Sequence, residues 1–501
     1  MTTSEVAWQR LDRRTVIVNT LNAAGVCVVA GVPTGIGVGG ATSPWLALAI
    51  IVPAALLIVG VVALADHLRW HKTRYRVLTD RVELHKGILV RSRRSLSRER
   101  IRSVDLTANL LLRFFGLVTV KIGTGEQTGT GTSLALYPVS KAEGERLRTE
   151  LLDRTPSGTG DGRRNGVLAA IDLGWVRFAP MSFVTPTLGV AAFGAVLQVA
   201  EWFGLQEGVI TWTIDRMRDL PLVAAILVLV VIGMVVGVIG ATGLFVEMWW
   251  QYRLEREPGG TLRVRRGLLT SRSISLEERR LRGVELVEPL GNRLVGAARV
   301  DAVATGLAKQ KESEKTDHKT LLPSAPRDVA DRVAAEVLRE DVSPTSAVRL
   351  RPHPVAARGR RVRWGLACVA AVVAPLLVLG WLLSVEVLLH LAWICAVVLV
   401  PVAVVLAIDA YRNLGHGLTG DYLVARSGTV RRGTVALQRR GVIGWTARQS
   451  IFQRRKGLLT LTATTAAGTG AYSVHDVGES DGLSFAESAV PDLFGPFLER
   501  G

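Results

Sequence analysis

The sequence predicts a membrane protein in which six transmembrane helices, arranged as three hairpins, alternate with three small β-barrels that are each closed by a C-terminal helix. Three observations lead to this fold class. The 501-residue chain contains six apolar runs long enough to cross a bilayer. The runs come in close pairs, and a polar stretch of domain length follows each pair. One motif recurs in all three polar stretches, which indicates an internal repeat.

The six candidate spans each have the length and apolar character that a membrane-spanning helix requires. They cover 16–39, 45–65, 181–203, 220–246, 364–386 and 389–409. Arginine and lysine gather before the first span, after the second and before the fifth, as at Arg14, Arg69 and Arg361. The positive-inside rule therefore predicts a multi-pass protein of the plasma membrane, with both termini and all three polar stretches in the cytoplasm. We expect an outer turn at 201–221, where acidic and basic residues are mixed.

Two features of the spans bear on their role. The sequence "GMVVG", Gly233 to Gly237, is typical both of helix pairing and of a merely glycine-rich apolar helix. Asp66, Glu247 and Asp409 each stand at the cytoplasmic end of the second span of a pair, where we expect a helix-end role rather than a proton path. No Asp, Glu or Lys lies in the middle of a span, which argues against a secondary transporter.

The internal repeat aligns without gaps when Gly87, Gly267 and Gly428 are superposed. The segments "RFFGL", "RLVGA" and "RRKGL" then coincide, so one motif of a basic residue and a glycine is used three times. Its members are Arg113 and Gly116, Arg293 and Gly296, and Arg454 and Gly457. We expect each of these glycines to lie just before a strand in its own domain.

The domains read as strands followed by a helix. "YRVLTDRVELHKGILVRSRRSLS" alternates apolar and polar residues around turn signals, as half-buried strands do. "SKAEGERLRTELL" opens with the capping-box residues Ser140 and Glu143 and predicts a closing helix. We expect corresponding helices in "APRDVADRVAAEVLRE" and, short or irregular, in "VPDLFGPFLER". The predicted segments are an N-terminal segment with hairpin 1 (1–66), domain 1 (67–155), a linker (156–180), hairpin 2 (181–250), domain 2 (251–340), a basic linker (341–363), hairpin 3 (364–410) and domain 3 (411–501).

The chain resembles the bacterial PH-domain membrane proteins of the YdbS/YdbT type. The resemblance rests on "LTDRVELHKGIL", "SLSRERIRSVDLTANLLLRFFGLVTVKI", "GLLTSRSISLEERRLRGVELVEPLGNRLVGAARV" and "LVARSGTVRRGTVALQRRGVIGWTARQSIFQRRKGLLTL", and it covers nearly the whole chain. It implies that the cytoplasmic domains are pleckstrin-homology-like (PH-like). It also suggests a part in cell-envelope maintenance or in bacteriocin and stress resistance, and a smaller PH-domain membrane protein as one candidate partner.

Basic residues dominate two segments beside the spans: 66–113 holds 13 Lys and Arg against 5 Asp and Glu, and 412–456 holds 10 against 1. Near an anionic leaflet each basic residue adds about 1 kcal/mol of attraction, and arginine pairs with phosphate through its planar fork. Basic residues beside span ends are also expected from topology alone, and PH-like domains also bind proteins. The candidate lipid- or partner-binding face comprises Arg91, Arg93, Arg94, Arg98, Arg100, Arg102, Arg431, Arg432, Arg439, Arg440, Arg454, Arg455 and Lys456.

No motif for catalysis, a cofactor, a metal or nucleic acid stands out. "GTGEQTG", Gly123 to Gly129, lacks the ending of a phosphate-binding loop, and the eight histidines have no metal-binding spacing. We therefore expect a non-enzymatic membrane scaffold whose cytoplasmic domains hold anionic lipid headgroups or a protein partner. The alternative is a component of a transport or export complex, which should show polar positions on facing helices in mid-membrane.

Overall fold

The computed structural model describes residues 8–41, 43–87, 91–101, 103–123, 133–152, 166–182, 184–306, 319–491 and 493. The chain folds into two compact units, Met1–Glu278 and Arg279–Gly501. The boundary between them falls inside predicted domain 2. The glycine-rich loop at 124–132 and Arg102 lie outside the described residues.

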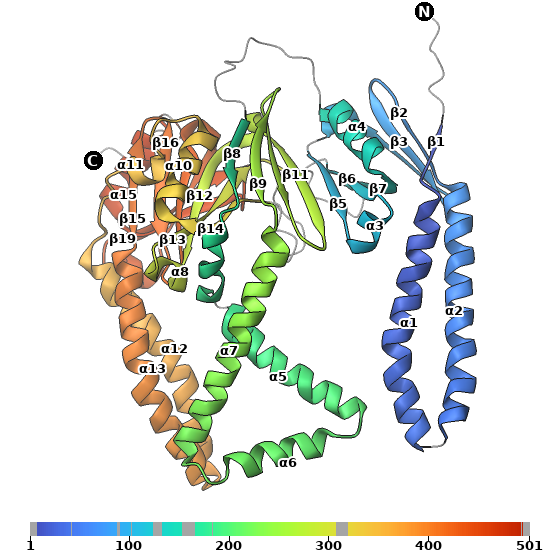
Figure 1. Cartoon of the computed structure of the whole chain (residues 1–501). Coiled ribbons are helices and arrows are strands. Elements are labelled where there is room, and N and C mark those ends of the chain that lie inside the picture. The colour runs from blue at the N-terminus through green and yellow to red at the C-terminus, as the bar shows by residue number, and fades with distance from the viewer. Residues whose placement is uncertain are drawn as a thin grey trace, which may run out of the picture. The chain divides into compact units, whose positions relative to one another are not determined.

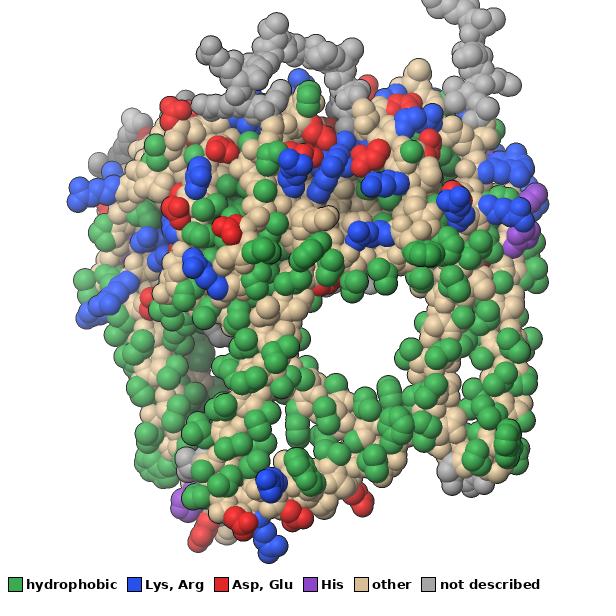
Figure 2. Space-filling view, viewed as in Figure 1, with side chains coloured by type: hydrophobic (Ala, Val, Ile, Leu, Met, Phe, Trp, Pro, Cys, Tyr) green, Lys and Arg blue, Asp and Glu red, His purple; other side chains and the backbone are tan. Residues whose placement is uncertain are grey.

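Six of the described helices are long and apolar enough to cross a membrane. They are α1 (Arg14–Ala41), α2 (Pro44–Lys72), α5 (Val184–Trp202), α7 (Leu222–Trp249), α12 (Val355–Leu382) and α13 (Glu386–Arg412). On the face shown in Figure 2, hydrophobic side chains cover these helices, whereas charged side chains gather over the strand-bearing parts. Such a continuous exposed apolar surface suits a lipid environment. The chain is therefore an α+β membrane protein.

The helices pack in pairs, α1 with α2, α5 with α7, and α12 with α13. In the α5–α7 pair the backbones approach closely at small residues. A Cβ atom added to Gly189 would lie 2.1 Å from the carbonyl oxygen of Gly233, and one added to Gly237 would lie 2.1 Å from that of Thr185. The "GMVVG" segment thus contacts α5, and side-chain-free positions permit the contact.

The connection between α5 and α7 differs from the expected turn. It contains a further helix, α6 (Gln206–Met217), which Figure 1 shows between α5 and α7. This helix exposes Ile210, Trp212 and Ile214. Residues 210 and 214 are four apart and share one face, which is a helical period. The charged residues between the apolar ones made this period hard to recognise in the sequence.

The first unit contains two antiparallel sheets. One has the strand order β1-β2-β3-β4 and the other β7-β6-β5-β11-β10-β9-β8. The strands are β1 (Gln9–Arg10), β2 (Arg74–Val77), β3 (Arg81–Lys86), β4 (Ser92–Ser97), β5 (Ser103–Ala108), β6 (Leu117–Gly123), β7 (Ser133–Ser140), β8 (Gly166–Ala170), β9 (Arg253–Glu257), β10 (Thr261–Arg266) and β11 (Ser271–Glu277). Its other elements are α3 (Leu110–Phe114), α4 (Lys141–Leu152) and the 3-10 segments Arg98–Arg100 and Leu173–Met181.

The second unit also contains two antiparallel sheets, with strand orders β14-β13-β12-β17-β16-β15 and β18-β19-β20. The strands are β12 (Leu281–Pro289), β13 (Ala297–Ala304), β14 (Thr320–Pro326), β15 (Gly415–Thr419), β16 (Tyr422–Ser427), β17 (Arg431–Gln438), β18 (Val442–Arg448), β19 (Leu458–Thr465) and β20 (Ala471–Gly478). The helices are α8 (Leu290–Leu294), α10 (Arg327–Leu338), α11 (Pro344–Ala347), α14 (Ile451–Arg454) and α15 (Glu479–Ala489). The segment 490–500, expected to form the third closing helix, lies largely outside the described residues, and α15 precedes it.

We expected a small β-barrel in each domain, closed by a C-terminal helix, but none of the sheets formed by the described strands closes into a barrel. The last three strands of one predicted domain instead join the first three of the next, through the β5–β11 and β12–β17 pairs. Period-two alternation identifies a strand and its buried face, but it carries no information about which neighbour pairs with each edge.

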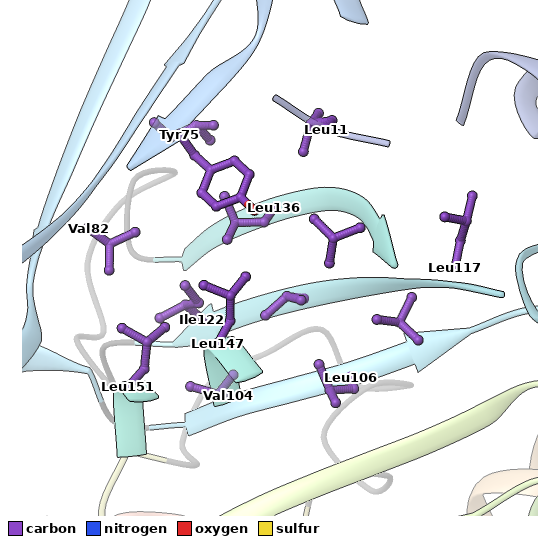
Figure 3. Packing of buried hydrophobic residues seen from close by; sticks show 14 of the residues in the cluster. Leu11, Tyr75, Val82, Val104, Leu106, Leu117, Ile122, Leu136, Leu147 and Leu151 are labelled. Atoms are coloured by element: carbon purple, nitrogen blue, oxygen red, sulfur yellow. The ribbon is translucent and has the colours of Figure 1, made fainter. Parts of the chain in front are cut away.

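The core of the first predicted domain lies between its strands and α4. Figure 3 shows Tyr75 and Val82 from the first sheet beside Val104, Ile122 and Leu136 from the second. Leu147 and Leu151 of α4 point into the same cluster, one helical turn apart (Figure 3). The core therefore spans two sheets, although neither sheet closes on itself.

Candidate lipid-binding site

The helix pair α12–α13 carries a groove of about 620 Å³ with an apolar wall and a polar mouth. One wall comes from α12, where Arg361, Gly365, Cys368 and Val372 recur at helical spacing and so share one face. The opposite wall comes from α13 and is formed by Leu399, Val402, Ala403, Leu406, Ala407 and Ala410. A basic mouth above an apolar wall matches the chemistry of a single anionic lipid.

Asp476 on β20 stands at this mouth and organises the arginines. Its side chain is fully buried and accepts from Arg360, from Arg361 at 3.4 Å and from Gln453 at 2.9 Å. The Nε atoms of both arginines are buried without a hydrogen-bond partner among the described residues. The two side chains are 25 % and 22 % exposed, and a lipid phosphate is a matched acceptor for the guanidinium N–H groups that face the mouth.

The recurrent glycines have one geometry. Gly116, Gly296 and Gly457 have φ of +69°, +70° and +60°, and each follows a short helix and directly precedes a strand. Each accepts, through its carbonyl oxygen, the amide of the first residue of the following helix, from Lys141, Arg327 and Glu479 at 2.9, 2.9 and 3.1 Å. A left-handed backbone of this kind favours glycine.

The short helices before these glycines carry exposed apolar side chains beside basic ones. In α3, Leu110 is 58 % and Phe114 84 % exposed next to Arg113, and in α14 Ile451 and Phe452 are 73 % and 62 % exposed next to Arg454. In α8, Leu294 is 78 % exposed.

Each short helix is tied to the end of a long one. Arg14 of α1 donates to the carbonyl of Phe115 beside α3 at 3.3 Å, and Arg293 of α8 pairs with Asp409 of α13 at 2.9 Å. In α14, Gln453 shares Asp476 with Arg360 and Arg361 of α12. The exposed apolar residues of these short helices therefore lie beside the helix ends where a bilayer surface would be.

The predicted basic face does not form one free surface. Arg431 pairs with Glu285 at 2.8 Å, and Arg432 makes two contacts with Glu288 at 2.8 and 2.7 Å. Arg439 donates to the carbonyl of Ser488 at 2.7 Å, at the C-terminal end of α15, where cations are favoured. These three arginines support the fold.

The remaining members of that face are distributed as follows. Arg98 donates to the carbonyls of Thr79 and Glu150, the second of which lies at the end of α4. Arg439 makes the equivalent contact at the end of α15. Arg94 is half-buried, and the side chain of Arg100 and all of Arg102 lie outside the described part of the chain. The exposed members are Arg91, Arg93, Arg440, Arg454, Arg455 and Lys456.

The acidic residues at the helix ends hold turns. Glu247 accepts from the amides of Leu269 and Thr270 at 2.8 and 3.2 Å. Asp409 accepts from the Thr429 hydroxyl at 2.6 Å and from Asn413 at 2.8 Å, in addition to Arg293. These contacts fit a structural role at the end of the helix.

Sequence reasoning treated Arg360 and Arg361 only as markers of topology and did not include Asp476. The available signal was the run of small residues on one face of the following span, at 365, 368 and 372. Nothing in the sequence indicated Asp476, because the carboxylate stands more than a hundred residues away, as the separation of the Arg360–Asp476 pair shows.

The comparisons agree with this architecture. The family model described as "Bacterial PH domain" matches residues 28–155 and 366–488, which together make up half of the chain. The chain is also 20 % identical over 441 residues to "UPF0699 transmembrane protein YdbT" of Bacillus subtilis (strain 168), a match that covers 83 % of this chain and 85 % of that protein. No solved structure matches. With two copies of the family's domain placed beside membrane-spanning helices, the chain belongs to the bacterial PH domain family.

Proposed function

We propose that this protein is a non-enzymatic, multi-pass scaffold of the plasma membrane that holds anionic lipid at the cytoplasmic face. The observation that carries the proposal is the α12–α13 groove, where the partly exposed guanidinium donors of Arg360 and Arg361 line the mouth above an apolar wall. A lipid phosphate would accept from these donors while an acyl chain follows the wall. The exposed apolar residues of α3, α8 and α14 would rest at the same interface.

The proposed orientation places both termini and all three PH-like domains in the cytoplasm, each domain following a helical hairpin. The arginine distribution supports it. Reporters that are active only outside the cytoplasm, fused after Leu152, Leu338 or Gly501, should be inactive at all three sites. Activity at any one of them contradicts the orientation.

Lipid binding is tested on the full chain in detergent with fluorescent phosphatidylglycerol as the probe and phosphatidylcholine as the neutral comparison. Arg361→Gln should weaken phosphatidylglycerol binding by about ten- to a hundredfold, because a charge-assisted hydrogen bond contributes roughly 1.5–3 kcal/mol. Arg358→Gln, an exposed residue of the same helix, is the matched control and should bind normally.

A second variant separates binding from folding, because Arg361 also pairs with buried Asp476. Cys368→Phe fills the groove without touching that ion pair, and it should weaken binding while thermal unfolding stays close to the parent. Equal binding of the neutral and the anionic lipid, or normal binding by Cys368→Phe, contradicts the proposal.

A further inference from the structure

The two joints between successive domains have the same register. In the first, Ser271 of β11 lies opposite Ala108 of β5. In the second, Arg432 of β17 lies opposite Glu288 of β12. Both Ser271 and Arg432 are the fourth residue after an anchor glycine, and both Ala108 and Glu288 are the eighth residue before a motif glycine. One docking rule therefore joins domain 1 to domain 2 and domain 2 to domain 3.

We call β5 and β12 acceptor strands, because each pairs with a strand of the next domain, and we call β11 and β17, the strands that they receive, donor strands. The acceptor strand of domain 3 is β18, and no donor strand pairs with it among the described strands. β18 is the edge of its sheet and pairs with β19 alone. Residues Thr446 to Ser450 are exposed, as is Ile443 at 62 %. Gly444 corresponds to Gly283, where an added Cβ would lie 1.9 Å from the carbonyl of Ala436 on the docked strand, whereas nothing lies within 4 Å of Gly444. An unpaired edge with a vacant approach is a template for another strand.

The donor strand of domain 1 is β4, and no acceptor strand pairs with it among the described strands. β4 corresponds to β11 and β17 in the repeat, yet it is the edge of its sheet and pairs with β3 alone in the described structure. Among the described strands, β4 and β18 are thus edges without a second strand neighbour, one of each kind needed for a joint that the chain makes twice. Such a pair of surfaces is complementary head to tail.

We propose that β4 of one copy adds to β18 of a second copy, which continues the array of domains between molecules in the same membrane. The shared register places each arginine of β4 opposite an uncharged residue, so no like charges stand directly opposite one another. The pairs are Arg91 with Gln449, Ser92 with Arg448, Arg93 with Ala447, Arg94 with Thr446, Ser95 with Trp445, and Leu96 with Gly444.

A charge pair supports the same occupant. Arg113 of domain 1 donates to the carbonyl of Leu268 in domain 2, and Arg293 of domain 2 pairs with Asp409, near the end of α13 just before domain 3. Each motif arginine thus reaches the membrane-side end of the next domain. Arg454 of domain 3 is exposed. In a following copy, Asp66 stands at the same end of the second span as Asp409, two positions earlier in the repeat alignment, where it pairs with Arg69 at 3.6 Å. The intermolecular joint would bring Arg454 to Asp66 of the second copy.

The test uses full chains in which Cys27, Cys368 and Cys395 are replaced by alanine. One tagged chain carries Ser92→Cys and a second, differently tagged, carries Arg448→Cys. After both are produced in one membrane and oxidised, a mixed disulfide should form. Arg93→Cys with Arg448→Cys, one residue out of register and on opposite faces, should give at least about tenfold less. Thr107→Cys with Arg272→Cys, directly opposite in the first joint, is the positive control within one chain.

A charge exchange provides the second readout. Arg454→Asp should reduce the mixed disulfide several-fold, and Asp66→Arg in the other chain should restore it. If the 92–448 disulfide is absent while the 107–272 disulfide forms, the second copy is not the occupant, and the edge belongs to another protein or to none. Equal yields for the in-register and out-of-register pairs also overturn the proposal. Both measurements are independent of the lipid groove.

Discussion

Glu288 on β12 and Arg432 on β17 form a two-point ion pair that bridges the strands of two successive domains, with oxygen–nitrogen distances of 2.8 and 2.7 Å. Glu288 is 3 % exposed and also accepts from Arg327 at 2.6 Å. Burial by itself raises the pKa of Glu288, but the hydrogen bond from Arg432 and the charge of Arg327 outweigh it and hold that pKa below its usual value. The buried carboxylate of Glu288 therefore stays ionised because its arginine partners are in place.

Removing one partner of this pair should destabilise the second unit. Arg432→Ala leaves buried Glu288 with Arg327 as its remaining ion-pair partner, and we expect a loss of roughly 1.5–3 kcal/mol in the free energy of unfolding. Exposed Asp328→Asn should change it by no more than about 0.5 kcal/mol. Thermal unfolding of the full chain in detergent compares the two. A double variant Glu288→Ala with Arg432→Ala should lose less than the two single effects added together, and additive losses would mean that the pair is not coupled.

Stability should fall between neutral and mildly acidic pH because of His416. Burial, followed by the nearby charges of His353 and Arg351, lowers its pKa from 6.5 to about 4. As pH falls from about 6.5 towards 4, His416 therefore becomes protonated in the unfolded state but stays neutral in the folded state. Stability contributed by the neutral ring is complete above pH 6.5, and about 2 kcal/mol of it should be gone at pH 5.

The measurement for this prediction is the unfolding temperature at pH 7.5 and at pH 5. His416→Gln should reduce the difference between the two values, because the variant has no proton to gain at that position. His353 and His475, whose pKa values burial also lowers, supply the part of the difference that remains. An unchanged pH dependence in His416→Gln is incompatible with this assignment.

Two glycines of domain 3 should differ in their tolerance of alanine. Gly428 has a φ of +101°, and a Cβ there would lie 2.1 Å from the carbonyl oxygen of Arg431. Gly457 has a φ of +60° and open space around the Cβ position. Gly457→Ala should cost about 1 kcal/mol from the left-handed backbone alone, whereas Gly428→Ala should cost more, because the turn must also move. Denaturation of the two variants side by side checks the order, and equal losses would be unexpected.

The α5–α7 contact should depend on one face of α5. Gly189→Leu should separate the helices, because its Cβ would stand 2.1 Å from the carbonyl of Gly233. Gly194→Leu on the same helix is the control, since nothing lies within 4 Å of that position. Cross-linking between cysteines placed at Leu188 and Gly240, whose Cβ positions lie 3.6 Å apart, reports the approach of the two helices. The cross-linking yield should fall in the first variant and persist in the second, and persistence in both would show that close approach is not required.

Local properties of the sequence were sufficient to locate the long helices. The fourth span was expected at 220–246 and is found at Leu222–Trp249, because hydrophobicity can be read from neighbouring residues alone. Helix α6 was missed because a short amphipathic helix resembles a polar turn when only charge is considered. Helix α15, which precedes the segment where the closing helix of domain 3 was expected, was missed for a similar reason. It contains small and polar residues, and its buried face consists of Gly482, Phe485, Ala486 and Ala489.

The candidate site was less predictable, because its contacts join distant segments. Arg431 and Arg432 were counted as free positive charge, yet Glu285 and Glu288, more than 140 residues earlier, neutralise them. That pairing depends on which strand lies beside β17, and alternation within β17 does not encode its neighbour. Exposed Arg440, Arg454 and Arg455 show that charge counts identify a basic region better than they identify its free members.

Strand sharing between domains also affects how the chain emerges during synthesis. The edge of β5 stays without its partner until β11, about 160 residues later, has been synthesised. At a translation rate of about 5–20 residues per second, this takes roughly 10–30 seconds. During that interval α5 and α7 must enter the membrane while β5 remains unpaired. The nascent first domain is therefore at its most vulnerable to wrong pairing before the second is made, and slower translation between residues 108 and 271 should lengthen the exposure.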